Sequence, residues 1–127
     1  MTLQDMLDAQ RRLQTEYMTG DPAEMRGEER ADFFRTMYVA LSAELAEAGQ
    51  EIAWKPWSSD KTYLDRQAYL EELVDAWHFF MNLMLIADIS ADEFVLAYDT
   101  KRKVNEQRQR DKYNASVSKG GGQGGKL

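Results

Sequence analysis

Apolar residues recur at helical spacing along almost the whole chain, and this periodicity constrains the fold more than any other feature. The two prolines, Pro22 and Pro56, both fall in breaks between helical patterns. No segment shows the alternation of apolar and polar residues that is typical of a half-buried strand. With 127 residues, the chain has the length of one ordinary domain. We therefore predict an all-α fold.

The apolar pattern predicts helices over residues 3–18, 30–53, 63–87 and 90–112. The first is expected to place Met6, Leu7, Leu13 and Tyr17 near one side. The second has an apolar face from Met37 through Leu41, Leu45 and Ala48 to Ile52. The third is apolar on nearly all sides through its second half, which is typical of a central, buried helix.

The composition changes after Tyr113, where glycine dominates and no apolar residue is periodic. Such a composition is typical of flexible segments that do not pack. We expect one domain over residues 1–113 and a disordered, Gly-rich tail over residues 114–127.

Charge and cysteine content exclude several classes of function. Lys and Arg total 16 against 22 Asp and Glu, a formal net charge of -6, which does not favour a nucleic-acid or membrane surface. The chain has no cysteine, which excludes disulfides, thiolate metal sites and cysteine nucleophiles. The first residues lack the features of a signal peptide, and the most apolar stretch is interrupted by polar residues. We expect a soluble, cytoplasmic protein.

Two pairs of acids are the most informative motif. Glu44 and Glu47 lie on the second predicted helix, and Glu72 and Asp75 on the third. Each pair has i, i+3 spacing and therefore shares one helical face. Four carboxylates in a partly dry cleft repel one another, unless a hard cation such as Mg²⁺ binds them together with substrate phosphates. The pattern indicates a Mg²⁺ site for a phosphorylated substrate, although solvated surface acids would have the same spacing.

Other polar residues also have two interpretations. His78 and Asn82 continue the helical line of Asp75 through the apolar run, either as hydrogen-bonded core residues or as part of a site. Trp54 and Trp57 cap the core or form a stacking platform for a base. The basic run over residues 101–113 is a solvated last helix or a set of donors to phosphate oxygens.

Four stretches, in this order, extend the acidic motif: LDAQRRLQ, AWKPW, EELVDAWHF and KRKVNEQRQRDKY. With ExxE and ExxD they resemble the motifs of the all-α nucleoside triphosphate pyrophosphatases. Within that group they are most similar to the dimeric dUTPases of phages, some bacteria and trypanosomatids. The resemblance runs from about Leu7 to Tyr113.

The resemblance implies a bundle of four to five helices that forms a homodimer and hydrolyses dUTP to dUMP and pyrophosphate. If the chain is phage-encoded, it would act in the host cytoplasm. Mg²⁺ would be the cofactor, with Mn²⁺ able to substitute. The implied metal ligands are Glu44, Glu47, Glu72 and Asp75, and Glu47 would also orient or deprotonate the attacking water. The implied substrate contacts are Gln10, Gln14, Lys55, Trp57, His78, Lys101, Asn105, Arg108 and Tyr113.

Three residues depart from the family pattern: Gln14 replaces an Asn, Arg102 an Asn and Lys112 a Gly. Gln14 is the departure that affects base selection, so hydrolysis of dCTP, alone or beside dUTP, is an alternative. A broad pyrophosphatase of the MazG type is a further alternative, against which the tryptophan loop and the closing NxxRQ argue. The last alternative function is that of a non-catalytic helical interaction module.

Overall fold

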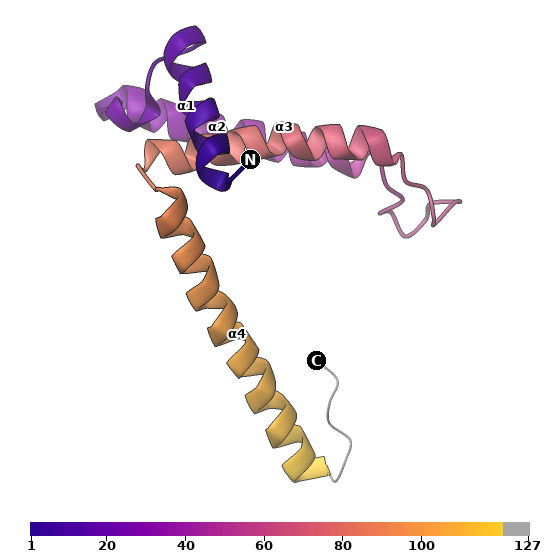
Figure 1. The fold of residues 1–127 in the computed structure, drawn as a ribbon. Coiled ribbons are helices and arrows are strands. Elements are labelled where there is room, and N and C mark those ends of the chain that lie inside the picture. The colour runs from indigo at the N-terminus through magenta and orange to yellow at the C-terminus, as the bar shows by residue number, and fades with distance from the viewer. Residues whose placement is uncertain (121–127) are drawn as a thin grey trace. The chain divides into compact units, whose positions relative to one another are not determined.

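The computed structural model describes residues 1–120, apart from the side chains of residues 119 and 120. The α helices are α1 (Leu3–Tyr17), α2 (Gly27–Gly49), α3 (Arg66–Ile86) and α4 (Ala91–Gly120), and a short 3-10 helix, η1 (Pro22–Glu24), follows α1 (Figure 1). The described residues contain no strand, so the all-α prediction is confirmed. The chain forms two compact units, Met1–Ser90 and Ala91–Leu127, and each is described by itself.

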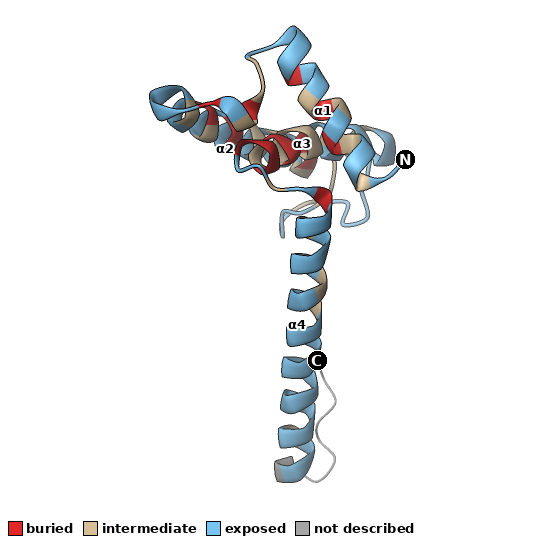
Figure 2. Ribbon diagram, turned by 60° about the vertical axis from the view of Figure 1, so that its left-hand side comes forward, coloured by how far each residue is buried: buried red, intermediate tan, exposed pale blue. Residues whose placement is uncertain are grey.

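The core of the first unit lies where α2 and α3 pack along each other. Met25, Phe33, Met37 and Ile86 form a buried cluster against which Phe34, Phe79 and Leu83 pack. Figure 2 shows the buried positions gathered where α1, α2 and α3 meet. The second half of α3 is buried at most positions, as its all-round apolar pattern predicts.

The buried face of α1 differs from the prediction. Its buried residues are Leu7, Gln10 and Gln14, whereas Leu13 is 39% exposed and Tyr17 is 77% exposed. The expected face was chosen for its apolar content, which favours Leu13 and Tyr17 over the two amides. The amides are instead held beside a polar residue of α3, a contact that periodicity alone does not reveal.

Local hydrogen bonds fix both ends of α1. Thr2 and Asp5 form a capping box, in which the Thr2 hydroxyl accepts from the Asp5 backbone N–H. At the other end, the Gln14 carbonyl accepts from the backbone N–H groups of Met18 and Gly20. Gly20 has φ +107°, a conformation that side chains disfavour, so glycine allows the chain to turn toward η1.

α2 begins at Gly27 rather than near residue 30, and it ends at Gly49 rather than near residue 53. Ile52 instead pairs with Leu64 in an isolated antiparallel bridge, and Ala53 N–H donates to the Tyr63 carbonyl at 3.1 Å. These contacts close the loop over residues 50–65, which Figure 1 shows at the end of the α2 and α3 pair away from α1. Asp65 then caps α3 by accepting from the Ala68 N–H.

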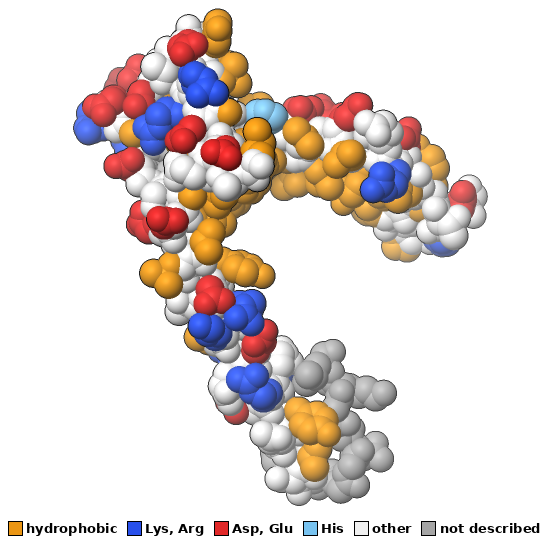
Figure 3. Space-filling view, viewed as in Figure 1, with side chains coloured by type: hydrophobic (Ala, Val, Ile, Leu, Met, Phe, Trp, Pro, Cys, Tyr) orange, Lys and Arg blue, Asp and Glu red, His pale blue; other side chains and the backbone are white. Residues whose placement is uncertain are grey.

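Both α2 and α3 also carry large apolar side chains that stay exposed. They include Tyr38, Val39, Leu45, Leu70 and Val74. The expected apolar face of α2 is therefore only partly buried, since Met37 and Ala48 are buried and Leu45 is not. Figure 3 shows hydrophobic side chains in a band along α2 and α3.

In the second unit, α4 continues beyond the predicted helix end near residue 112 and includes residues 114–120 of the expected tail. The rest of that tail lies outside the described residues. Most of α4 is exposed, and Asp99 forms ion pairs with Arg102 and Lys103. None of the helices over the described residues has the length and apolar content needed to cross a membrane.

Candidate functional site: a pocket between acids and amides

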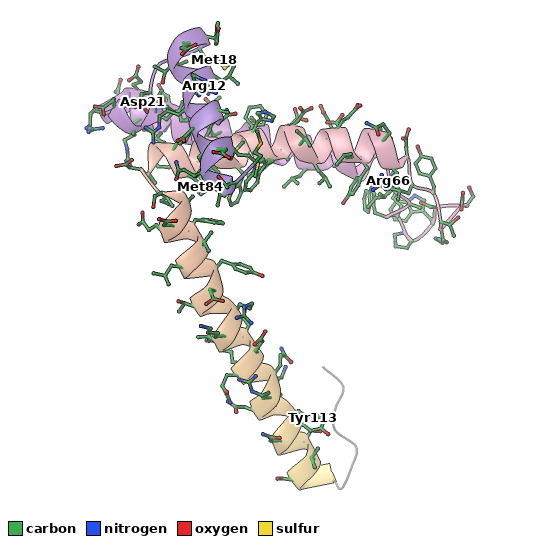
Figure 4. The ribbon with its side chains drawn as sticks, in the orientation of Figure 1. Arg12, Met18, Asp21, Arg66, Met84 and Tyr113 are labelled. Carbon is green, nitrogen blue, oxygen red and sulfur yellow. The ribbon has the colours of Figure 1, made fainter. Side chains whose placement is uncertain are left out.

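A pocket of about 420 Å³ lies among α1, α2 and α3, a volume in the range of small-ligand sites. Its residues are Gln10, Leu13, Gln14, Met18, Met37, Glu44, Asp75, His78, Phe79 and Asn82. Met18 is labelled in Figure 4, at the end of α1. The pocket thus combines acids from α2 and α3 with amides from α1 and α3.

The acid end of the pocket brings together residues of both predicted motifs. Glu44, Glu72 and Asp75 each offer a carboxylate oxygen, and these oxygens lie within 4.8 Å of one another. Oxygen ligands of one Mg²⁺ are about 3 Å apart when adjacent and about 4.2 Å apart when opposite, so the three side chains would have to move closer together to coordinate one ion directly. The i, i+3 spacing explains why Glu72 and Asp75 reach the same place from one helix.

Two of these side chains have an oxygen that is buried without a hydrogen-bond partner among the described residues, Glu44 Oε2 and Glu72 Oε2. Such atoms are uncommon in folded proteins and call for an explanation. A bound divalent cation provides one, because it would replace the lost hydration and cancel the repulsion between the carboxylates. The donor set, oxygens alone, suits Mg²⁺.

The proximity of these acids changes the titration of Glu72. The pKa of Glu72 is raised from its ordinary value of 4.5 to about 7, first by a hydrogen bond of its protonated carboxyl with Glu44, then by loss of hydration and by Glu47. In the metal-free protein Glu72 therefore holds its proton at a pH where an exposed glutamate has lost it.

Glu47 is less closely placed than the sequence predicts. It lies one turn after Glu44 on α2 and is exposed, and it is not in the cluster of oxygens within 4.8 Å. It is still close enough to raise the pKa of Glu72. Glu47 thus lies at the border of the acid cluster.

The amide end of the pocket is internally bonded. Gln10 Nε2 donates to Asn82 Oδ1 at 2.9 Å, and Asn82 Nδ2 donates to Met37 Sδ at 3.3 Å. Gln14 is buried too, but its side-chain amide makes no hydrogen bond with the described residues. The sequence singled out Gln10 and Gln14, whereas the partnership of Asn82 and Met37 was missed, and an amide inside an apolar run was the available signal.

His78 lies between the two ends. Its Nδ1 is 2.8 Å from the Val74 carbonyl oxygen. Because a carbonyl only accepts, Nδ1 carries the proton, which leaves Nε2 as an acceptor when the ring is neutral. His78 lines the pocket, as a substrate contact would.

Lys55 and Trp57 are not among the pocket residues. They belong to the loop over residues 50–65, where Trp57 is 75% exposed and packs edge-on against Trp54 at 6.5 Å between ring centroids. Lys55 lies over the Trp54 ring at 5.8 Å. The tryptophans therefore do not cap the core, and an exposed aromatic pair remains available for stacking.

Lys101, Asn105, Arg108 and Tyr113 all lie on α4, in the second unit (Figure 4 labels Tyr113). Arg102 and Lys103 are held in ion pairs with acids of the same helix. Lys101 and Arg108 form no ion pair among the described residues and share one helical stripe with Asn105. A hollow of about 560 Å³ along α4 includes Lys101 and Asn105, but one helix does not enclose a ligand.

Comparison with known proteins agrees with this geometry. The sequence model of the dUTPase family matches residues 2–94. The chain belongs to the dUTPase family. A dCTP pyrophosphatase of Enterobacteria phage LZ5 is 31% identical over 139 aligned residues, which cover 84% of this chain and 80% of the phage protein. No solved structure matches the chain.

The family match includes the whole pocket and all four predicted acids, but it ends before the basic run of α4. The resemblance in the first unit is therefore confirmed. The roles of Lys101, Asn105, Arg108 and Tyr113 stay predictions.

Proposed function

We propose that the chain is a Mg²⁺-dependent pyrimidine deoxynucleoside triphosphate pyrophosphatase that hydrolyses dUTP to dUMP and pyrophosphate. The observation that carries the proposal is the pair of buried, unpartnered carboxylate oxygens of Glu44 and Glu72 beside a pocket lined with amides. Membership of the dUTPase family supports it.

In this proposal Glu44, Glu72 and Asp75 hold the cation. Bound Mg²⁺ would neutralise the phosphate chain, polarise the phosphoryl group and lower the pKa of a water ligand. Glu47, exposed at the border of the cluster, is suited to orient that water or accept its proton. No cysteine nucleophile is required for such a displacement by water.

The rest of the pocket suits a base. Phe79, Met37 and Leu13 provide apolar surface, and Gln10, Gln14 and Asn82 are its uncharged amides. We assign Trp57 and Lys55 to nucleoside and phosphate contacts, which would require the loop to approach the bound substrate. Lys101, Asn105, Arg108 and Tyr113 are assigned to phosphate and sugar contacts, for which the two unpaired cations are suited.

Hydrolysis of dCTP is a second candidate function. It is favoured by the relative from phage LZ5, which is named a dCTP pyrophosphatase. Gln14 in place of Asn gives one pocket amide a longer reach toward the base edge. Both candidates share the metal chemistry and differ only in the contacts of the base.

Pyrophosphate release from dUTP, dCTP, dTTP, dATP, dGTP and UTP tests the proposal, each with Mg²⁺, with Mn²⁺ and with excess chelator. We expect release from dUTP, with or without dCTP, that the chelator abolishes. Release from all six nucleotides would replace the proposal with a broad pyrophosphatase. Absence of release from every nucleotide would favour a non-catalytic helical module.

We further infer that the chain forms a homodimer through α2 and α3. The exposed apolar side chains of Tyr38, Leu45, Leu70 and Val74 on these two helices support this, because exposed apolar surface favours contact with a protein surface. Light scattering after gel filtration should give twice the chain mass of 14.7 kDa. A monomer at micromolar concentration would contradict the inference, and Leu45→Glu should reduce the dimer fraction.

A further inference from the structure

A buried polar chain leads from the pocket into the core. Gln10 donates to Asn82 at 2.9 Å, and Asn82 donates to Met37 at 3.3 Å, so the chain joins α1, α3 and α2. The exposed fractions of Gln10, Asn82 and Met37 are 4%, 2% and 8%. Little water is therefore available to replace either bond if a partner turns.

The direction of this chain is set by the sulfur at its inner end. A thioether has no hydrogen to donate, so Asn82 must turn its NH₂ group toward Met37 and its oxygen toward Gln10. Gln10 must then give its NH₂ group to Asn82 and turn Oε1 away. Oε1 makes no hydrogen bond with the described residues and is not one of their fully buried, unpartnered atoms, so it keeps some exposure, and Gln10 lines the pocket.

Gln14 offers a contrast within the same pocket. Its side-chain amide makes no hydrogen bond with the described residues, so nothing fixes which of its two polar atoms faces the ligand. An amide that turns freely can present either an acceptor or a donor. The pocket therefore has one amide that hydrogen bonds orient and one that no hydrogen bond with the described residues orients.

This difference matters because uracil and cytosine have nearly the same shape. Uracil has a donor at N3 and an acceptor at position 4, whereas cytosine has an acceptor at N3 and a donor at position 4. An acceptor fixed in the pocket can pair with a donor of one base. At the same position the other base has an acceptor, which repels it, so the site can discriminate strongly. A reversible amide pairs with both.

We propose that Met37 and Asn82 are positioning residues that hold Gln10 with its oxygen toward the base, so that Gln10 rather than Gln14 discriminates uracil from cytosine. This inference rests on the proposed function, because it concerns the base of the same substrate. It assigns a role to two residues, one of them apolar, that do not themselves need to contact the reacting atoms.

The test replaces the sulfur while keeping the core filled. Met37→Leu has similar volume, but leaves Asn82 free to turn and with it Gln10. We expect the ratio of kcat/KM for dUTP and dCTP to move toward one by about tenfold, the equivalent of one oriented hydrogen bond. Met84→Leu, at a buried position of α3 outside the pocket (Figure 4), is the matched control and should leave the ratio unchanged.

A second substitution should restore discrimination. An ionised Asp side chain has two acceptor oxygens. In the Met37→Leu background, Asn82→Asp therefore places an oxygen toward Gln10 whichever way the Asp side chain turns. We expect the dUTP to dCTP ratio to return toward the wild-type value. Gln14→Ala should lower kcat/KM for both nucleotides by a similar factor.

The side-chain amide of Gln10 gives a readout that is independent of turnover. In NMR spectra of the wild type, its NH₂ protons should exchange slowly with solvent, and in Met37→Leu they should exchange faster. An unchanged ratio together with unchanged exchange in a folded Met37→Leu variant would overturn the inference, as would a wild-type ratio near one. Absence of hydrolysis by the wild type would instead overturn the proposed function, and with it this role for Gln10.

Discussion

The two ends of the pocket are both polar, but only one is internally paired. At the amide end, Gln10 and Asn82 bond to each other and Asn82 bonds to Met37. At the acid end, Glu44 Oε2 and Glu72 Oε2 have no partner among the described residues. Because buried polar atoms are normally paired within the protein, the comparison separates groups that hold the structure together from groups that require a ligand.

The same contrast predicts opposite effects on stability. Removing a paired amide leaves its partner without a hydrogen bond, so the fold is destabilised. Removing charge from the acid cluster relieves repulsion, so the metal-free fold is stabilised although activity is lost. A protein that gains stability as it loses function at one site is typical of an active site under electrostatic strain.

The largest expected effect is on turnover at the acid end. Asp75→Asn and Glu47→Gln should each lower kcat/KM by more than about a hundredfold, because each removes a charge that stabilises the cation or the attacking water. Steady-state pyrophosphate release with Mg²⁺ measures this. Glu16→Gln, an exposed acid of α1, is the control. Activity within about tenfold of wild type in both variants would remove these acids from the site.

The amide end should show the largest loss of stability. Asn82→Ala should lower the free energy of unfolding by about 2–3 kcal/mol, because it leaves a small cavity and an unpaired Gln10 amide. Urea denaturation with chelator present measures the change. Asn114→Ala, at an exposed position of α4, should change it by less than about 0.5 kcal/mol. Equal effects of the two variants would mean that the buried amide pair does not stabilise the fold.

The acid end should make the metal-free protein less stable as pH rises. The folded pKa of Glu72 is about 7 against an ordinary value of 4.5. Between these values the unfolded chain loses a proton that the folded chain keeps, so this contribution to the free energy of unfolding is largest below 4.5 and is lost as pH approaches 7.

Glu72→Gln isolates that contribution. From pH 5 to pH 8, the free energy of unfolding should fall less in the variant than in wild type, and the variant should be the more stable protein at pH 8. Urea denaturation with chelator at the two pH values measures this. A variant less stable than wild type at pH 8 would show that the Glu72 carboxylate is satisfied in the fold, and would contradict the contrast between the two ends.

The smallest effect is expected from an ordinary ion pair outside the pocket. Arg11 contacts Asp21 at 2.8 Å, and both side chains are partly exposed. Arg11→Gln should lower the free energy of unfolding by about 0.5–1 kcal/mol, since partly solvated pairs contribute little. Arg12→Gln, one residue on and exposed, is the control (Figure 4 labels Arg12 and Asp21). If Arg11→Gln lowered the free energy of unfolding as much as Asn82→Ala, the buried amide pair would stabilise the fold no more than a partly exposed ion pair does.

Spacing within one helix was the part of the site that the sequence could reveal. Glu72 and Asp75 meet because i and i+3 positions share a face, and Glu44 joins them because α2 and α3 pack side by side. The contact of Gln10 with Asn82 spans 72 positions of sequence, so no local pattern carries it. Choosing the buried face of α1 by its apolar residues favoured Leu13 and Tyr17, whereas the residues that are buried include the amides Gln10 and Gln14.

The helices were predictable from their periodicity, whereas several of their ends were not. The predicted second helix ran on to Ile52, which instead pairs with Leu64 across the loop, a tertiary contact that overrides local propensity. The fourth was predicted to end near residue 112, but α4 continues to Gly120. Glu47 shows the same limit in the site, because its spacing predicts its face but not its exposure.

Calorimetric titration of Mg²⁺ into the metal-free protein measures whether the acid cluster binds a cation. Wild type, the Glu44→Gln/Glu72→Gln double variant and Glu16→Gln are compared at pH 8. We expect saturable binding to wild type and Glu16→Gln, and no binding to the double variant, which should remain folded. Equal binding to all three, or none to the folded wild type in the presence of a non-hydrolysable dUTP analogue, would contradict the claim that these buried oxygens form a cation site.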